Sequence, residues 1–213
     1  MVKSVQDHLK KMPDEGGVME SIVERRSIRK YKAQEVPKEQ IEQIVEAAIK
    51  APSAKNRQPW KYLIYSDQGK KQLLDAMEIG LDNLSKIPDF PAKSNGGLAD
   101  AYNTLKIMRE APVLIIVMNT NGNSPFEGIT PDARITEICD SLSIGASVEN
   151  MLLKATELGL GTLWIANTFY AYNEMMELIG EKGQLVCAVA VGYPDESPSA
   201  RPRRGLADVI EWR

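Results

Sequence analysis

Residues 24–32 hold the densest group of charged side chains that could bind a ligand, with five cations and one carboxylate. Within this stretch, Arg25, Arg26 and Arg29 surround Ser27. Guanidinium groups bind phosphate through paired hydrogen bonds, and a serine hydroxyl can donate or accept one more. An isolated basic run can equally be a solvated helix end that interacts favourably with the helix dipole. Binding of an anion, and of phosphate in particular, is the first chemistry that the sequence suggests.

A second group of polar side chains lies in residues 51–60, between a predicted helix and a predicted strand. The prolines at positions 52 and 59 make the loop rigid, and Ser53, Asn56 and Gln58 supply hydroxyl and amide groups. Turn chemistry alone would explain these residue types. Proteins also mount binding groups on tight loops of this kind, so these three side chains are candidate ligand contacts.

Several kinds of catalytic site are excluded by what the sequence lacks. The chain of 213 residues has one histidine, His8, which leaves no Ser-His-Asp or Cys-His arrangement and no His-rich metal site. It has no G-x-x-x-x-G-K-[ST] loop, and residues 159–161 lack the third glycine of the dinucleotide fingerprint. An enzyme with this sequence would therefore take its chemistry from a bound organic cofactor, with neither a metal nor a catalytic side chain assigned.

Composition also bounds the partners and the location. The net charge of −3 argues against nonspecific nucleic-acid binding by the whole surface. No apolar run reaches the roughly 18 residues of a membrane span, and residues 1–20 lack an apolar signal core. Cys139 and Cys187 both lie among apolar residues, which favours reduced thiols over a disulfide. We expect a cytoplasmic protein that binds neither nucleic acid nor membrane.

Hydrophobic periodicity predicts the elements that position these groups. A short helix is predicted with one apolar face, formed by Val18, Met19, Ile22 and Val23, that we expect to pack on a core. The arginines directly follow this helix, so their positions would be fixed by its packing. A second helix has Pro37 in its first turn and a buried stripe through Ile41, Ile44, Val45, Ala48 and Ile49. The predicted strands are 60–65, 113–118, 159–165 and 185–191, and a short helix is predicted around 175–179.

A long helix is predicted from position 131 to 158, with an uncharged middle at residues 141–148. The helix could be interrupted near Gly145, because glycine is unfavourable inside a helix. A helix that is apolar nearly all round is either central in its own domain or shared with a second subunit. We favour the shared arrangement, because small residues in the middle let another backbone approach closely.

Two further segments have predicted roles. Residues 67–110 begin as a helix and become irregular around 87–97, which is typical of a lid over a pocket and equally of a plain surface loop. The predicted lid runs from Leu81 to Asn103. The tail carries a second basic cluster, with Arg201 and Arg203, and then apolar side chains that we expect to dock on a partner. These are Leu206, Val209, Ile210 and Trp212.

Four of these segments, in this order, resemble the nitroreductase family of FMN-dependent oxidoreductases over nearly the whole chain. They are residues 25–29, 52–60, 157–165 and the Gly-Tyr-Pro turn at 192–194 followed by Arg201 and Arg203. The resemblance implies an α+β fold with a mixed central β-sheet flanked by helices. It also implies an intertwined homodimer with two FMN molecules at the interface. The whole chain, 1–213, would be one FMN-binding domain, with the lid within 67–110 and a carboxyl-terminal arm at 195–213.

The resemblance also implies roles for individual residues. Arg25, Ser27 and Arg203 would hold the FMN phosphate and ribityl hydroxyls, assisted by Arg26 and Arg201. Arg29 would lie near the pyrimidine end of the flavin, where a cation makes reduction easier. The remaining implied cofactor contacts are the loop residues Pro52, Ser53, Asn56 and Gln58, which would reach the flavin of the other subunit, and Trp164, Ile165 and Ala166, which would face its N5 edge.

The implied activity is hydride transfer from NADH or NADPH through flavin N5 to a small planar acceptor, such as a nitroaromatic or a quinone, by a ping-pong mechanism. Glu78 is followed four residues later by Asp82 instead of the tyrosine of the deiodinase branch, which argues against deiodination. Flavin-consuming and other specialised branches stay open as alternatives. So do a noncatalytic nucleotide- or anion-binding module and an oligomeric scaffold built on the uncharged helix.

Overall fold

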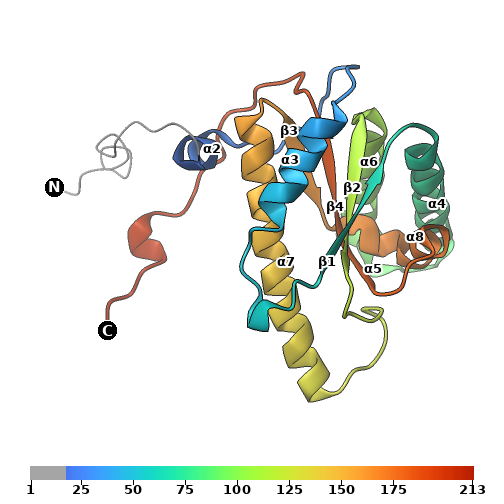
Figure 1. Cartoon of the computed structure of the whole chain (residues 1–213). Helices are drawn as coiled ribbons and strands as arrows, with labels where there is room; N and C mark the ends of the chain where they lie inside the picture. The colour runs from blue at the N-terminus through green and yellow to red at the C-terminus, as the bar shows by residue number, and fades with distance from the viewer. Residues whose placement is uncertain (1–17) are drawn as a thin grey trace.

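The computed structural model describes residues 18–213, and Figure 1 shows a four-stranded sheet between two groups of helices. The expectations for His8 and for the apolar content of the first 17 residues lie outside the described residues. The helices are α2 (Val18–Glu24), α3 (Lys38–Ala48), α4 (Asp67–Lys86), α5 (Pro91–Ser94), α6 (Gly97–Glu110), α7 (Pro131–Glu157) and α8 (Tyr172–Ile179). The strands are β1 (Trp60–Tyr65), β2 (Val113–Asn119), β3 (Gly161–Ile165) and β4 (Gln184–Gly192), with single 3-10 turns at Ala54–Asn56, Asn167–Ala171 and Leu206–Asp208.

The strand order is β1-β2-β4-β3, and every neighbouring pair is antiparallel. The connection through α4 to α6 returns the chain to the end of the sheet where β1 finished, since Tyr65 pairs with Leu114. In the part of the chain that the structure describes, the parallel component is one isolated bridge between Ser27 and Thr162. The central sheet that we expected to be mixed is thus an antiparallel sheet with this single parallel bridge on its β3 edge.

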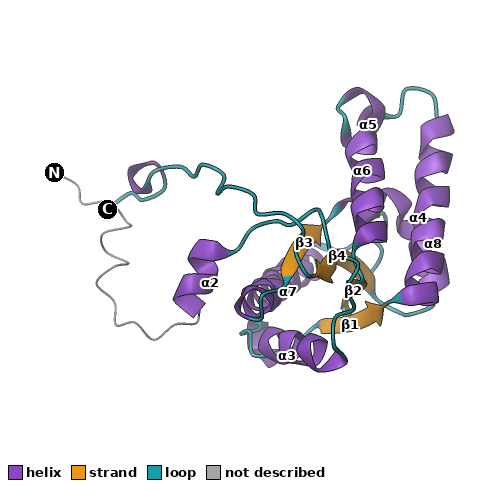
Figure 2. Ribbon diagram, turned by 90° about the horizontal axis from the view of Figure 1, so that it is seen from above, coloured by secondary structure: helices purple, strands orange, loops and turns teal. Residues whose placement is uncertain are grey.

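Helices cover both faces of the sheet and produce two cores. Figure 2 shows α3 and α7 on one face and α4, α5, α6 and α8 on the other. All seven residues of β2 are buried, as the continuous apolar run predicted for a strand covered on both sides. On α3 the predicted stripe is confirmed at Ile41, Ile44 and Ala48, whereas Ile49 is exposed because the helix ends before it.

The long helix α7 runs for 27 residues without a break at Gly145. A single glycine costs a helix interior about 1 kcal/mol relative to alanine, which the packing of neighbouring turns easily offsets. Ile135, Ile138 and Leu142 on this helix are 61%, 52% and 70% exposed. Their spacing of three and four residues places them on one face, so α7 presents an uncovered apolar stripe.

The helix α2 does not pack as the sequence predicted. Ile22 and Val23 are 53% and 52% exposed, whereas Ser21 is buried at 4%. The helix contacts α7 with the face that carries Ser21, which turns these two apolar side chains outward. Figures 1 and 2 both show α2 and the carboxyl-terminal arm on the same side of the molecule, beyond α7. The arm's Trp212 is 93% exposed.

The segment predicted to contain a lid is more helical than its sequence suggested. α4 continues to Lys86 and α6 begins at Gly97, so the irregular part is short and includes the one-turn helix α5. Leu81, Leu98 and Ala101 are buried in the core. None of the helices in the described part of the chain combines the length and the apolar composition needed to cross a bilayer.

Buried proton donors make the fold sensitive to alkali. Burial raises the pKa of the Cys187 thiol from 9.0 to about 12 and that of the Tyr62 phenol, which is bonded to Ser147, from 10.0 to about 12. At pH values between the ordinary pKa and the raised pKa of each group, the unfolded chain loses a proton that the folded protein keeps. The free energy of unfolding therefore falls as the pH rises through this range. We expect denaturant midpoints to decrease from about pH 9 to about pH 12, less steeply in Tyr62→Phe. An equal slope in this variant would contradict the assignment to Tyr62.

Candidate functional site

Basic side chains from the two ends of the described chain line one cavity of about 270 Å³. The segment after α2 supplies Arg25, Arg26, Ser27 and Arg29, and the tail supplies Arg201 and Arg203. Ile22, Val23 and residues 198–200 complete the walls. The two basic clusters that are far apart in the sequence therefore converge in space, as binding of a single anion requires.

Backbone pairing holds the first cluster in place. Ser27 bridges Thr162 of β3, and the Ile28 amide donates to the Thr162 carbonyl at 2.9 Å. On the other side, the amide of Lys32 donates to the carbonyl of Tyr193 at 2.9 Å. The segment is thus clamped between the edge of β3 and the chain that leaves β4, so the arginines project from a fixed backbone.

Several guanidinium groups in the cavity also bind protein oxygens. Arg26 Nη1 donates to the carbonyls of Val23 and Arg25 at 2.7 and 2.9 Å, at the carboxyl end of α2. Arg29 Nη1 donates to the Ser27 carbonyl at 3.1 Å. Each group keeps further N–H donors, because an arginine side chain has five.

Two carboxylates contact this cluster. Glu149 of α7 lies 3.7 Å from Arg25 Nε, and Glu196 accepts from the Arg29 backbone amide at 2.5 Å. Five guanidinium groups line the cavity, so positive charge remains in excess after both carboxylates are counted. The electrostatics of the cavity favour an anion.

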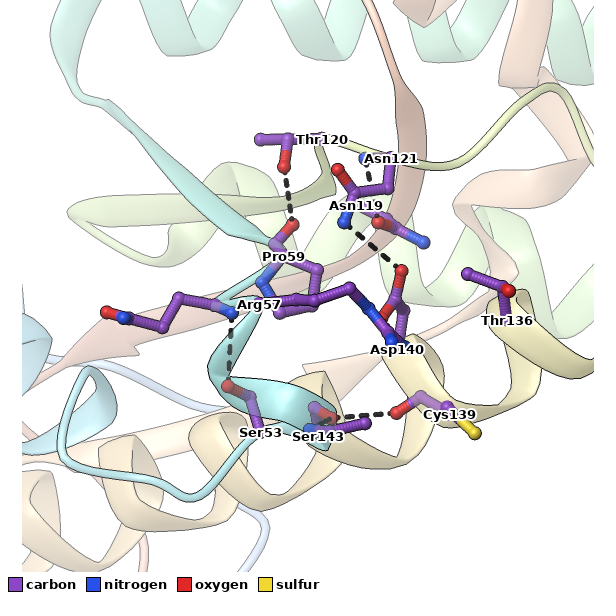
Figure 3. A network of polar contacts seen from close by, with 12 residues as sticks. Ser53, Arg57, Pro59, Asn119, Thr120, Asn121, Thr136, Cys139, Asp140 and Ser143 are labelled. Atoms are coloured by element: carbon purple, nitrogen blue, oxygen red, sulfur yellow. Dashed lines mark hydrogen bonds and ion pairs between the residues drawn. The ribbon is translucent and has the colours of Figure 1, made fainter.

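The loop at residues 52–59 is fixed to α7 and β2, as Figure 3 shows. The Ala54 amide donates to Ser143 Oγ at 3.2 Å, and the Pro59 carbonyl accepts from the Thr120 amide at 2.7 Å. Ser53 Oγ accepts from the Gln58 amide at 3.0 Å within the loop. None of the loop residues lines the cavity of the basic clusters.

Trp164, Ile165 and Ala166 form the end of β3 and the residue after it. Ile165 is buried at 3%, Trp164 is 43% exposed, and Ala166 is exposed. A Cβ atom at Gly145 of α7 would lie 3.9 Å from the Trp164 ring, so this ring sits over the small residue of the helix. These three residues also lie outside the cavity of the basic clusters.

The helix α7 places all three groups relative to one another. Glu149 contacts Arg25, Gly145 lies beneath Trp164, and Ser143 binds the 52–59 loop. Six residues separate Glu149 from Ser143, which is about 9 Å along a helix. Within one chain the predicted site residues thus form three neighbouring groups along α7 instead of one closed pocket.

A larger hollow of about 1010 Å³ lies between α3 and β1, and its chemistry is different. Lys70 there donates to the carbonyls of Arg109 and Ala111 at the end of α6, and burial lowers its pKa. The other charged residues of this hollow are Glu35, Lys38, Glu42, Glu46 and Asp67. Acidic groups outnumber basic ones, so the smaller cavity is the better phosphate site. Among residues 18–213, no cluster of three metal-ligating side chains is present.

Asp140, which anchors the 52–59 loop through Arg57, was not among the residues predicted from the sequence. Two features of the sequence could have indicated this ion pair. Asp140 directly precedes the uncharged middle of a long helix, and Arg57 lies between the amide residues of the loop. Glu149 and Glu196 were not predicted either, since spacing along the chain does not reveal which carboxylates contact the arginines.

Comparison with known proteins identifies the family. The sequence model of a protein family, described as the nitroreductase family, matches residues 22–193. A Methanothermobacter thermautotrophicus protein, provisionally named NADH dehydrogenase/NAD(P)H nitroreductase, is 29% identical over 190 residues, with 86% of this chain and 81% of the relative covered. Nitroreductase NfnB of Mycolicibacterium smegmatis is 26% identical, with 88% and 89% covered.

A similar solved structure comes from Desulfovibrio desulfuricans, a provisionally named nitroreductase in complex with FMN. It has a TM-score of 0.69 at 26% identity, with 93% of this chain and 98% of that chain covered. The α+β architecture, the shared elements and the match over most of the sequence lead to one conclusion. The chain belongs to the nitroreductase family of oxidoreductases.

Proposed function

We propose that this protein is an FMN-dependent oxidoreductase that takes hydride from NADH or NADPH and passes it to a small planar acceptor, such as a nitroaromatic or a quinone, by a ping-pong mechanism. The observation that carries the proposal is the convergence of five arginines from two distant segments on one cavity. The FMN-bound relative and the NAD(P)H in the name of the other relative support it.

The donor set fits the phosphate end of FMN. A surplus of guanidinium groups around Ser27 matches a dianionic phosphate and neighbouring hydroxyl groups. Pockets for whole ligands of this size are roughly 300–1,000 Å³, so a cavity of about 270 Å³ takes one end of the cofactor. The isoalloxazine end would extend beyond it, toward groups that α7 positions or that a second subunit supplies.

The arginines and the serine of the cavity have three different tasks in this proposal. Arg25, Ser27 and Arg203 bind the phosphate and ribityl oxygens, and Arg26 and Arg201 add positive charge. Arg29 lines the same cavity, and in this proposal it occupies the side nearest the isoalloxazine, where its cation would stabilise negative charge on the pyrimidine end. The bound flavin would supply two-electron transfer through N5, so the proposal requires no acid or base from the protein and names no catalytic side chain.

The other predicted contacts belong to the ring end of the cofactor. Pro52, Asn56 and Gln58 are exposed and Ser53 is partly exposed, so these side chains are accessible to a flavin held by a partner subunit. The backbone at residues 164–166 would face the N5 edge. The segment between α4 and α6 would act as the lid that selects the acceptor.

We include a homodimer in the proposal because apolar side chains are exposed on three segments. They are Ile22 and Val23 on α2, the stripe on α7, and the tail residues Leu206, Val209, Ile210 and Trp212. Uncovered large apolar side chains on several elements support a protein interface. The arm at 195–213 would then dock on the partner. A cytoplasmic location fits the two cysteines, which are both free.

The purified protein tests this function directly. We expect a yellow preparation that releases FMN on denaturation and bleaches when NADH or NADPH is added without oxygen. A nitroaromatic or a quinone should then restore the colour. FMN binding without bleaching would favour a noncatalytic nucleotide-binding module, and failure to bind FMN on reconstitution would contradict the proposal. Net loss of flavin during turnover in air would favour a flavin-consuming enzyme.

A further inference from the structure

The carboxylate of Asp140 on α7 is almost completely buried, with its side chain 1% exposed. Its Oδ1 accepts from Arg57 Nε at 2.9 Å and from Arg57 Nη2 at 2.7 Å, and its Oδ2 accepts from Asn121 Nδ2 at 3.2 Å. Both oxygens are therefore occupied by donors from two different loops. Figure 3 shows Arg57 reaching from its loop to this point on α7.

A buried ion pair of this kind contributes little net stability, because desolvation of the charges opposes their attraction. Its directional hydrogen bonds do restrict geometry. Here they connect α7 with the turn after β2 and with the loop that carries the predicted flavin contacts. The network therefore acts mainly on the position of the loop.

The loop around Arg57 depends on such restraints. Asn56 and Gln58, which flank Arg57, adopt positive φ angles of 53° and 49°, a conformation that is unfavourable for residues other than glycine. Both of these residues are exposed, whereas the Arg57 side chain turns inward to Asp140. Holding Arg57 inward therefore directs its two neighbours outward.

We propose that Arg57, Asp140 and Asn121 form a positioning network that holds Asn56 and Gln58 ready to contact the flavin. These three are positioning residues, since they act through the loop. The inference rests on the proposed function. Preorganisation of the loop lowers the entropy that is lost when the cofactor binds, so loss of the network should weaken binding without loss of any direct contact.

The test is the double variant Arg57→Met with Asp140→Leu, which removes both charges and keeps apolar volume at the site. Because no buried charge is left unpaired, we expect the variant to fold with a Tm close to that of the parent. We expect the Kd for FMN to rise by at least about tenfold, the effect of having to order one or two side chains of the loop when the cofactor binds. The Kd for riboflavin should rise by the same factor, and the absorption spectrum of bound flavin should change, because the altered contacts lie at the ring end.

The control is Lys61→Met with Glu181→Leu, which removes an ion pair of 2.7 Å between β1 and the chain after α8 that contacts neither Arg57 nor Asp140. It should leave FMN affinity and the spectrum unchanged. If the first double variant does not fold, the variant Arg57→Lys tests the inference instead. It keeps the positive charge but cannot form the paired hydrogen bonds from Nε and Nη2 to Asp140. We expect it to weaken FMN binding in the same direction.

Unchanged affinity and an unchanged spectrum in a folded variant would overturn the inference, as would weaker binding of FMN alone with riboflavin unaffected. Failure of the parent protein to bind FMN would instead contradict the proposed function. The two failures are therefore distinguishable.

Discussion

Replacing Arg25 and Arg203 together by alanine is expected to lower FMN affinity by about two to four orders of magnitude. A hydrogen bond to a charged group contributes about 1.5–3 kcal/mol, and about 1.4 kcal/mol corresponds to a factor of ten. Folding should be retained, because Arg203 is exposed and the contact of Arg25 with Glu149 is long, at 3.7 Å, and partly exposed. Titration by quenching of flavin fluorescence at one fixed salt concentration measures the effect.

The specificity of this loss for phosphate can be checked in two ways. Riboflavin lacks the phosphate group, so its affinity should change far less than that of FMN. Arg204→Ala removes one positive charge from the same tail, as the Arg203 substitution does, at a position that does not line the cavity, and should change FMN affinity little. A comparable loss in Arg204→Ala would show that net charge matters instead of the cavity.

The elements of the fold were predictable from local patterns. The continuous apolar run at 113–118 and the spaced apolar residues of α3 each have one physically reasonable arrangement against a core. The rotation of α2 was not predictable in this way, because both faces of this helix offer small or apolar side chains. The helix packs against α7 and Ser21 is buried while Ile22 and Val23 are exposed, so hydrophobic periodicity does not decide which face is buried.

The candidate site was predictable in part. The residue types at 25–29 and 201–203 indicated anion binding, but their convergence came only from resemblance to a family, since no spacing rule connects segments so distant. The structure now shows the physical link, because the first segment pairs with Thr162 and with the chain after β4 that leads to the tail. Asp140 was missed for a similar reason. Its partner Arg57 lies far away in sequence and meets it only after α7 packs beside the loop.

The close approach of residue 28 to β3 leads to the second large effect. A Cβ atom at Gly161 would lie 2.7 Å from Ile28 Cγ1 and 2.9 Å from two other Ile28 atoms. Ile28 cannot easily move, since it is 6% exposed and its amide binds Thr162 at 2.9 Å. Gly161→Ala should therefore push the 25–29 segment away from β3, with a loss of about 1–3 kcal/mol in the free energy of unfolding and weaker FMN binding.

A double-mutant cycle separates this steric effect from other roles of the glycine. In an Ile28→Ala background the added methyl group has room, so Gly161→Ala should cost clearly less free energy of unfolding than in the parent. Gly128→Ala is the control for the substitution itself, because a Cβ atom there meets nothing within 4 Å. Denaturant unfolding gives the stabilities, and fluorescence titration gives the FMN affinities. If the costs of Gly161→Ala and Ile28→Ala simply add, contact with Ile28 is not the reason that position 161 requires glycine.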